Sequence, residues 1–321
     1  MQCYFAPLEG VTSAPYRQAH HRHFGGVDRY YAPFISPTIH HVLTPREQRD
    51  ILPEFNEGLP VIPQLLTKRA EDFLWAANDM AAMGYREVNL NLGCPSGTVV
   101  SKGKGSGFLA HLEELERFLD EIYEKSPIAI SIKTRLGVQE PDEFGPILEL
   151  YNRYPIPELT IHPRVQKQMY RGEVSLEHFA KAVAESKHLL CYNGDLNTVS
   201  DINAHLERFP SVQNVMLGRA FVADPALAQK AKGGKPADRA TLEAFHHDLF
   251  EGFSASMKSQ RNAMLRLKEI WFYHINLFDG YDKHIKRLRK ANDVTEFLAA
   301  AAAIYRELPL REEVVPGWKK P

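Results

Sequence analysis

The chain of 321 residues is poor in cysteine and contains only Cys3, Cys94 and Cys191, which lie far apart. An odd number of widely spaced cysteines argues against a disulfide framework and indicates a reducing compartment, so we expect a cytoplasmic protein. None of the three has the CxxC or histidine-cluster spacing of a zinc site, and we predict no metal centre.

Long apolar runs are also lacking. No run reaches the roughly 18 residues that a membrane span needs, and residues 1–7 lack the basic region and apolar core of a signal peptide. We therefore expect no membrane partner. The formal net charge is only −1, so a nucleic-acid partner can be inferred only from the local distribution of charge.

Short β-rich runs alternate with segments of helical period over the first two thirds of the chain. The predicted strands are residues 3–7, 29–34, 59–64, 87–92, 128–133, 158–162, 188–193 and 214–218. Between them, segments such as 71–83 and 112–124 have the apolar spacing of amphipathic helices. This alternation predicts an α/β fold, an eight-stranded parallel (β/α)8 TIM barrel; a doubly wound open sheet is the alternative.

The pattern changes after Asp224 and Pro225. A polar stretch at 230–239 precedes a segment, 241–306, that has helical period throughout. We predict a barrel catalytic domain at 1–235, a small all-helical domain at 240–308 and an irregular tail at 309–321.

The strand 87–92 ends in a pattern typical of a reaction centre. It places Asn91 at its carboxyl end, then Cys94 in a turn before Pro95 and a glycine-rich loop at 97–107. A polar residue at the end of a barrel strand and a thiol on a mobile loop beside it favour catalysis. A small buried structural cysteine is the alternative.

Polar residues or glycines also stand at the carboxyl ends of six other predicted strands, where barrels build their active sites. They are Glu9 and Gly10 after Pro7, then Gln64, Lys133, His162, Asn193 with Asp195, and Gly218 with Arg219. The last two ends follow strands seven and eight, a common phosphate site in barrels, because glycine lets the backbone approach an anion and arginine adds positive charge. Ordinary turns are the alternative.

Lysine at a strand end is costly to bury without an anionic or electron-rich partner. Lys133 could form a Schiff base or stabilise an electron-accepting ring. His162 with Arg164 could serve in acid–base chemistry or in phosphate or substrate contacts, or be structural. The neutral amides of Gln64 and Asn91 suit the edge of a planar heterocycle. Amides, a lysine and a phosphate cradle together predict a flavin mononucleotide (FMN) site.

With these motifs the chain resembles the tRNA-dihydrouridine synthases. The matching segments are 6–12, 63–65, 89–96, 133–137, 162–164 with Gln168, Tyr170 and Gly172, 193–195 and 216–219, with a weaker match at 266–268. The Asn-x-Gly-Cys-Pro-Ser segment is specific, whereas the glycine-based phosphate motifs are shared with other flavin barrels. Two features depart from the family pattern: proline follows His162, and the loop after Cys94 carries Lys102 and Lys104.

The resemblance implies that FMN, reduced by NADPH, gives a hydride to C6 of a uracil in tRNA while Cys94 protonates C5. Such a reduction needs a proton donor near C5, because hydride addition leaves an enolate-like anion. The implied flavin contacts are Pro7, Gln64, Lys133, His162, Asn193, Asp195, Gly218 and Arg219. The expected substrate contacts are Asn91, Arg164, Tyr170, Arg266 and Lys268.

Basic residues concentrate in the predicted helical domain. Residues 258–290 hold nine lysines and arginines against three acidic residues, a local charge of +6, so the rest of the chain carries −7. A uridine must leave its stack to reach a flavin, which requires backbone contacts outside the pocket. We expect a monomer that binds tRNA partly through this domain and acts on a uridine of the D-loop region; a solvated helix face is the alternative.

Three other functions compete. A dihydroorotate-type flavin dehydrogenase would act on a free pyrimidine and would not need the basic domain. A tRNA-binding or tRNA-folding protein could carry flavin chemistry as a secondary property. A lysine-dependent aldolase would use Lys133 but leaves Cys94 and the amides unexplained.

Overall fold

The structure, a computed structural model, describes residues 1–317, so residues 318–321 of the predicted tail lie outside the described part. Its centre is one parallel sheet with the strand order β3-β2-β1-β9-β8-β7-β6-β5-β4. The strands are β1 Gln2–Phe5, β2 Arg29–Tyr31, β3 Val61–Ile62, β4 Gln64–Leu65, β5 Glu87–Leu92, β6 Ala129–Arg135, β7 Glu158–His162, β8 Leu189–Tyr192 and β9 Asn214–Leu217.

The sheet closes because its two terminal segments belong to one stretch of chain. Only Pro63 separates β3, which pairs with β2, from β4, which pairs with β5. Proline has no N–H to give to a ladder, but its carbonyl still accepts from the Asn89 N–H at 2.9 Å. The predicted TIM barrel is therefore confirmed, with the strand expected at 59–64 divided in two at its proline.

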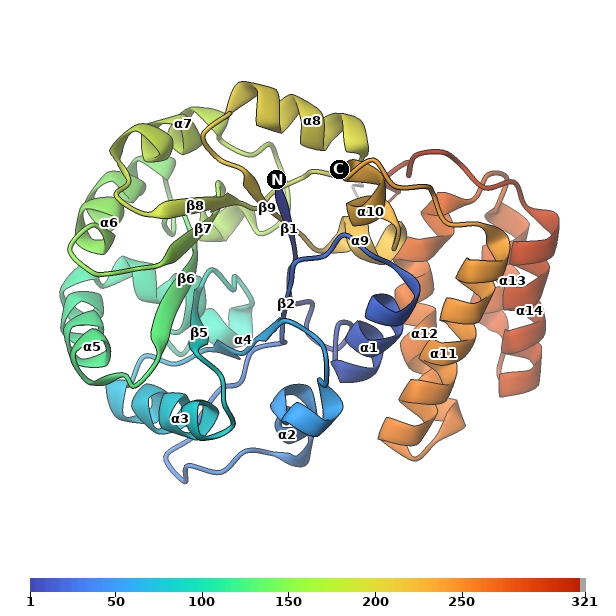
Figure 1. Ribbon diagram of the computed structural model, residues 1–321, viewed down its shortest axis with the longest axis horizontal. Helices are drawn as coiled ribbons and strands as arrows, with labels where there is room; N and C mark the ends of the chain where they lie inside the picture. Colours follow the sequence, from blue (N-terminus) through green and yellow to red (C-terminus); the bar gives the residue numbers. More distant parts are fainter. Residues whose placement is uncertain (318–321) are drawn as a thin grey trace.

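Helices surround the strands (Figure 1). Those on the barrel side are α1 Ala14–His23, α2 Pro45–Ile51, α3 Ala70–Ala82, α4 Gly97–Val100, α5 Leu112–Lys125, α6 Phe144–Tyr151, α7 Leu176–Glu185, α8 Val199–Arg208, α9 Arg219–Ala223 and α10 Leu227–Ala231. The crossover helices are amphipathic, and α5 buries Leu115, Leu119 and Ile122 against the sheet side. None of the described helices is long and apolar enough to cross a membrane.

The amino-terminal end of the barrel is closed by polar side chains. Glu158, at the start of β7, accepts hydrogen bonds from Tyr4 (2.9 Å), Tyr31 (3.2 Å) and Asn214 (2.9 Å). Cys191 is buried close to these side chains inside the barrel. Buried side chains therefore occupy this end of the barrel.

A helical region follows the barrel and stands to one side of it (Figure 1). It consists of α11 Arg239–Met257, α12 Gln260–His274, α13 Asp282–Lys290 and α14 Val294–Glu307. It packs on the barrel through α11 against α1 and through α12 against α9. One continuous apolar cluster runs through both parts, so the helical region is fixed to the barrel by a shared core.

Buried histidines lie in this shared core. His20 contacts the Tyr30 hydroxyl (2.8 Å) and the Pro225 carbonyl (3.0 Å), and His274 contacts the Ala223 carbonyl (3.2 Å). Burial lowers the pKa of His20 to about 3 and that of His274 to about 4. Both rings therefore stay neutral in the folded protein at about pH 5, where the same histidines of the unfolded chain are protonated.

Acid should weaken this core. Since the folded pKa values lie below the unfolded value of about 6.5, the unfolded state binds more protons below pH 6.5 and stability falls as pH drops. We expect the loss in free energy of unfolding between pH 7 and pH 5, measured in urea, to be about 2 kcal/mol smaller in His274→Gln than in the parent protein. His40→Gln, at an exposed histidine, should leave the loss unchanged; an equal loss in all three proteins would contradict this origin.

Candidate active site

A cleft of about 490 Å³ opens at the carboxyl ends of the strands and extends to α12. Eleven of the fourteen predicted catalytic, flavin and substrate contacts line it: Pro7, Gln64, Asn91, Cys94, Lys133, His162, Tyr170, Asn193, Asp195, Gly218 and Arg219. Its volume falls within the range of small-molecule and cofactor sites. The strand ends that were expected to converge therefore form one site.

The turn after β5 is fixed by one amide. The Asn91 Oδ1 accepts the N–H groups of Gly93 (3.0 Å) and Cys94 (2.9 Å), and its Nδ2 donates to the Gln64 Oε1 at 2.7 Å. Gln64 in turn donates to the Asn89 Oδ1 at 2.8 Å. Asn91 thus sets the position of Cys94 from within the barrel, a role that the sequence did not reveal.

The segment beside Cys94 is folded, unlike the mobile loop we expected. It contains α4 and the 3₁₀ helix Gly105–Ala110. The Ser106 hydroxyl donates to the Cys94 carbonyl at 2.8 Å, and Phe108 and Leu109 are buried in the core. Gly105 has φ +57° and lies against Cys94, where an added Cβ would come within 2.8 Å of the Cys94 carbonyl oxygen.

The Cys94 thiol is a protonated group in this setting. It is partly buried, and burial raises its pKa above the ordinary value, while Lys133 and Arg135 act in the opposite direction. Because the pKa is raised, the thiol keeps its proton through neutral pH. It can therefore act as a proton donor, and the two cations favour the thiolate that remains afterwards.

Two cations of β6 face the cleft. Lys133 and Arg135 are two residues apart, so their side chains leave the same face of the strand. Burial, and then the charge of Arg135, lower the pKa of Lys133 to about 8. Arg135 was not predicted, although this spacing was the available signal; it donates to the Gly93 carbonyl at 2.9 Å and the Val165 carbonyl at 3.1 Å.

His162 is held neutral with one defined donor. Burial and four neighbouring cations, Arg135 first, lower its pKa well below the ordinary value. The Arg164 guanidinium lies 3.1 Å from the His162 Nε2. Since arginine can only donate, Nε2 must accept, and the proton of the neutral ring is assigned to Nδ1.

Asp195 joins two arginines. Its carboxylate accepts from Arg164 at 2.5 Å and from Arg219 at 3.3 Å. Asp195 itself has φ +46°, a left-handed conformation, and its carbonyl accepts from the Asn197 side chain at 2.7 Å. Arg164, which is almost fully buried and does not line the cleft, therefore acts through Asp195 and His162.

Tyr170 lines the cleft, and two guanidinium groups lie near its ring. Its ring centroid is 5.4 Å from Arg135 and 5.0 Å from Arg219. The side chain is 56% exposed, so one arginine-supported aromatic surface is available to a ligand.

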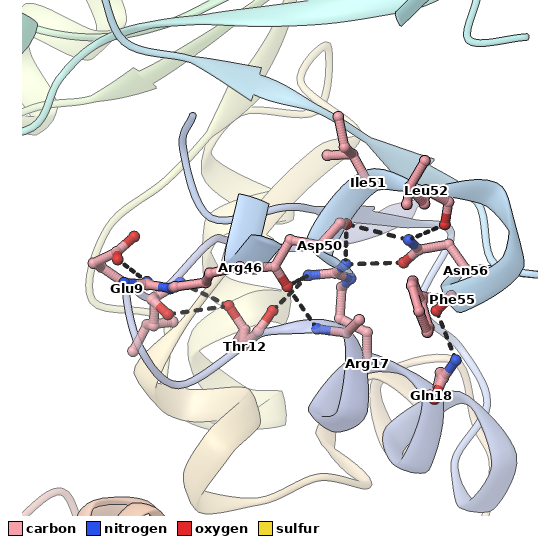
Figure 2. Close-up of polar contacts among 12 residues, drawn as sticks. Glu9, Thr12, Arg17, Gln18, Arg46, Asp50, Ile51, Leu52, Phe55 and Asn56 are labelled. Atoms are coloured by element: carbon pink, nitrogen blue, oxygen red, sulfur yellow. Dashed lines mark hydrogen bonds and ion pairs between the residues drawn. The ribbon is translucent and has the colours of Figure 1, made fainter. Parts of the chain in front are cut away.

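Hydrogen bonds and ion pairs hold the loop between β1 and α1 in place (Figure 2). Arg17, buried in α1, donates to the Thr12 carbonyl at 2.8 Å and to the Asn56 side chain at 2.8 Å, and pairs with Asp50. At the tip of the loop Glu9, which lines the cleft, forms an ion pair with Arg46 of α2. This network holds the loop that carries Pro7 and Glu9 against the site.

Besides Arg164, two further predicted substrate contacts lie outside the cleft. Lys268 donates to the carbonyls of Arg289 (3.2 Å) and Ala291 (2.5 Å), so it satisfies the carboxyl end of α13. Arg266 pairs with Glu269 and lies against Gly10 of the β1–α1 loop. Both side chains are thus engaged in joining elements of the protein.

The donor set suits an anionic ligand with a planar ring. The cleft presents the Lys133 ammonium, the His162 ring and the Arg219 guanidinium, and Gln64 supplies an amide. In residues 1–317 no group of three or more histidine, cysteine or acidic side chains could hold a metal ion. The residues therefore fit a flavin phosphate better than a metal cofactor.

Comparisons with known proteins show which sequences and folds this chain resembles. A family model described as "Dihydrouridine synthase (Dus)" matches residues 4–308. A "Probable tRNA-dihydrouridine synthase" of Staphylococcus epidermidis (strain ATCC 12228 / FDA PCI 1200) is 25% identical over 296 residues, 89% of this chain and 81% of the relative. "Probable tRNA-dihydrouridine synthase 1" of Synechocystis sp. is 26% identical over 306 residues, 91% and 82% of the two chains.

Among solved structures, morphinone reductase has a similar fold. It superposes with a TM-score of 0.53 at 14% identity, over 75% of this chain and 88% of that one. At this identity the likeness supports the barrel architecture alone.

Lys133 should destabilise the ligand-free protein. Its folded pKa of about 8 lies below the unfolded value, so the destabilisation is complete below pH 8 and disappears as pH rises to about 10.4. We expect Lys133→Met to have a higher free energy of unfolding than the parent protein at pH 7, with the gain shrinking by pH 10. Denaturant titrations of flavin-free protein at both pH values test this. Lys125→Met, at an exposed lysine of α5, is the control, and a pH-independent gain would contradict the assignment.

Proposed function

Because the chain belongs to the dihydrouridine synthase family, we propose that it reduces a uridine of tRNA to 5,6-dihydrouridine, with FMN as the resident flavin and NADPH as the reductant. The members of this family are flavin-dependent oxidoreductases that act on tRNA. The observation that carries the proposal is the position of Cys94, whose backbone Asn91 holds at a cleft rich in cationic donors; burial, which raises the pKa of its thiol, agrees with a role as proton donor.

The bound flavin supplies a hydride, and with it two electrons, to C6 of the uracil. Cys94 supplies the other hydrogen: its S–H bond breaks as a C–H bond forms at C5, and the sulfur retains the electron pair as a thiolate. Lys133 and Arg135 stabilise this thiolate, since both charges lower the pKa of Cys94. A proton from solvent then restores the thiol.

The flavin contacts follow from the donors that face the cleft. We propose that Gln64 and Pro7 lie along the ring edge and that Lys133 favours negative charge on the reduced ring. Asn193, Gly218 and Arg219 would hold the phosphate, with His162 as a neutral donor beside it. Asp195 orients Arg219 by the hydrogen bond at 3.3 Å.

For the substrate, we propose that Tyr170 stacks on the extracted uridine and that Asn91 and Arg164 position the groups around it. The uridine has to leave the tRNA fold to reach Cys94, so the rest of the tRNA must be held outside the cleft. We assign this binding to the helical region 240–308, and we propose a uridine of the D-loop region as target and a monomer as the active form.

A direct test uses anaerobically reduced protein. An unmodified tRNA transcript, but not uracil or orotate, should return the oxidised-flavin absorbance. Reoxidation by the free base alone would favour a small-molecule dehydrogenase, and absence of bound flavin would overturn the cofactor assignment.

Cys94 can be examined separately from flavin reduction. Cys94→Ala should retain flavin and oxidise NADPH at a rate close to that of the parent protein, but lose at least about 100-fold in dihydrouridine formation, the usual contribution of a positioned general acid. Mass spectrometry of digested tRNA measures the product. Cys191→Ala, which removes a thiol buried inside the barrel, is the control. Full product formation by Cys94→Ala would refute its role as the acid.

The basic face of α13 should control the salt dependence of tRNA binding. Lys286 and Lys290 are both exposed and lie one turn apart. If each neutralises one phosphate, the double alanine variant should reduce the slope of log affinity against log salt by about 1.8. Filter binding over a salt series measures the slope. Alanine at Lys181 and Lys187, on the outside of the barrel, is the matched control; equal slopes for the parent protein and both variants would remove α13 from the interface.

A further inference from the structure

Two aromatic side chains of α12 line the edge of the cleft that faces the helical region, and the proposed chemistry gives them no role. Phe272 of α12 lines the cleft together with Tyr273. Its side chain is 44% exposed, whereas its neighbours Trp271 and His274 are buried in the core. Phe272 is therefore the most exposed of the rings that α12 presents to the cleft, since Tyr273 is half-buried.

Phe272 has a guanidinium partner from the next helix. The centre of the Arg289 guanidinium lies 6.0 Å from the centroid of the Phe272 ring. Arg289 belongs to α13, whose exposed basic residues are Lys283, Lys286, Arg287, Arg289 and Lys290. An apolar ring beside so many cations, at the edge of a cleft, fits an occupant that combines negative charge with flat apolar faces.

A nucleic acid has that combination. Its phosphates match the cations of α13, and its bases stack on aromatic rings and on guanidinium planes. Extraction of a uridine also leaves the adjacent base without one stacking neighbour. A ring at the mouth of the cleft can replace that neighbour and offset part of the cost of extraction.

We propose that Phe272, supported by Arg289, is a stacking site for the base next to the reduced uridine of the tRNA. This inference rests on the proposed function and adds to it a specific contact outside the reaction centre. Since every base has an apolar face, the contact contributes affinity and has little preference for base identity. Phe272 is thus a positioning residue, distinct from the groups that touch the reacting atoms.

The first experiment measures affinity of the flavin-loaded protein for an unmodified tRNA transcript at fixed salt. Phe272→Ala should weaken binding by about 5- to 150-fold, the range for loss of one base–aromatic stack, and Phe272→Trp should restore it. Leu265→Ala is the matched control, because Leu265 lies on the same helix, is 48% exposed and does not line the cleft. At saturating tRNA, kcat for Phe272→Ala should stay within about twofold of the parent value.

The second experiment identifies the base. The reduced uridine is located in the product, and the transcript is remade with an abasic nucleotide on either side of it. An abasic site at the stacked position should weaken binding to the parent protein but cause little further loss with Phe272→Ala, because both changes remove the same contact. Additive losses at both flanking positions would overturn the proposal.

The outcomes separate this proposal from the proposed function. If tRNA is bound but not reduced, the function fails, while the affinities of the Phe272 and Leu265 variants still decide whether the ring contacts RNA. If tRNA is reduced but Phe272→Ala binds like the parent protein, or Leu265→Ala shows an equal loss, the stacking site fails and the function stands.

Discussion

An excess of positive charge at the carboxyl end of the barrel is the constraint on which the site depends. Lys133, Arg135 and Arg219 line the cleft, and Arg164 lies directly behind it. One carboxylate, that of Asp195, joins Arg164 to Arg219. Burial and these charges together keep His162 neutral, and burial and Arg135 lower the pKa of Lys133. Binding of an anionic ligand would offset this excess of positive charge and so stabilise the cleft.

The Cys94 thiol, which we propose as the proton donor, is placed by a different kind of interaction. Asn91 connects its own strand to Gln64 and fixes the turn that carries Cys94, all by hydrogen bonds between neutral groups. Ser106 holds the same turn from the other side. These bonds are made to the backbone of Cys94, whereas the pKa of its thiol is raised by burial against the opposing charges of Lys133 and Arg135. The position of Cys94 and its protonation state therefore have separate structural causes.

The sequence predicted the barrel well because its strands end in polar residues and its helices are strongly amphipathic. It placed the strand at 59–64 correctly but could not predict its division, since the effect of Pro63 depends on which neighbour each half pairs with. Arg135 was missed because the predicted strand ended at Lys133, whereas β6 continues for two more residues to Arg135. The positions of Lys268 and of the segment after Cys94 depend on tertiary contacts, with the carbonyls of α13 and with the core around Phe108, that no local pattern contains.

The barrel and the helical region provide two kinds of surface that one surface could not combine, a partly dehydrated one and an exposed basic one. Proton donation by Cys94 requires a partly dehydrated site fixed on strands, whereas capture of a folded RNA requires an exposed and hydrated basic surface. Here α12 belongs to both: its buried face, with Trp271 and His274, is fixed in the shared core, and its Phe272 edge reaches the mouth of the cleft. The shared core fixes Phe272, the stacking site that we propose, relative to Cys94. Substitution of Phe272 should therefore alter the affinity for tRNA, and substitution of Cys94 should alter the chemical step. The two residues belong to one folded core, but only Cys94 contributes a reacting group.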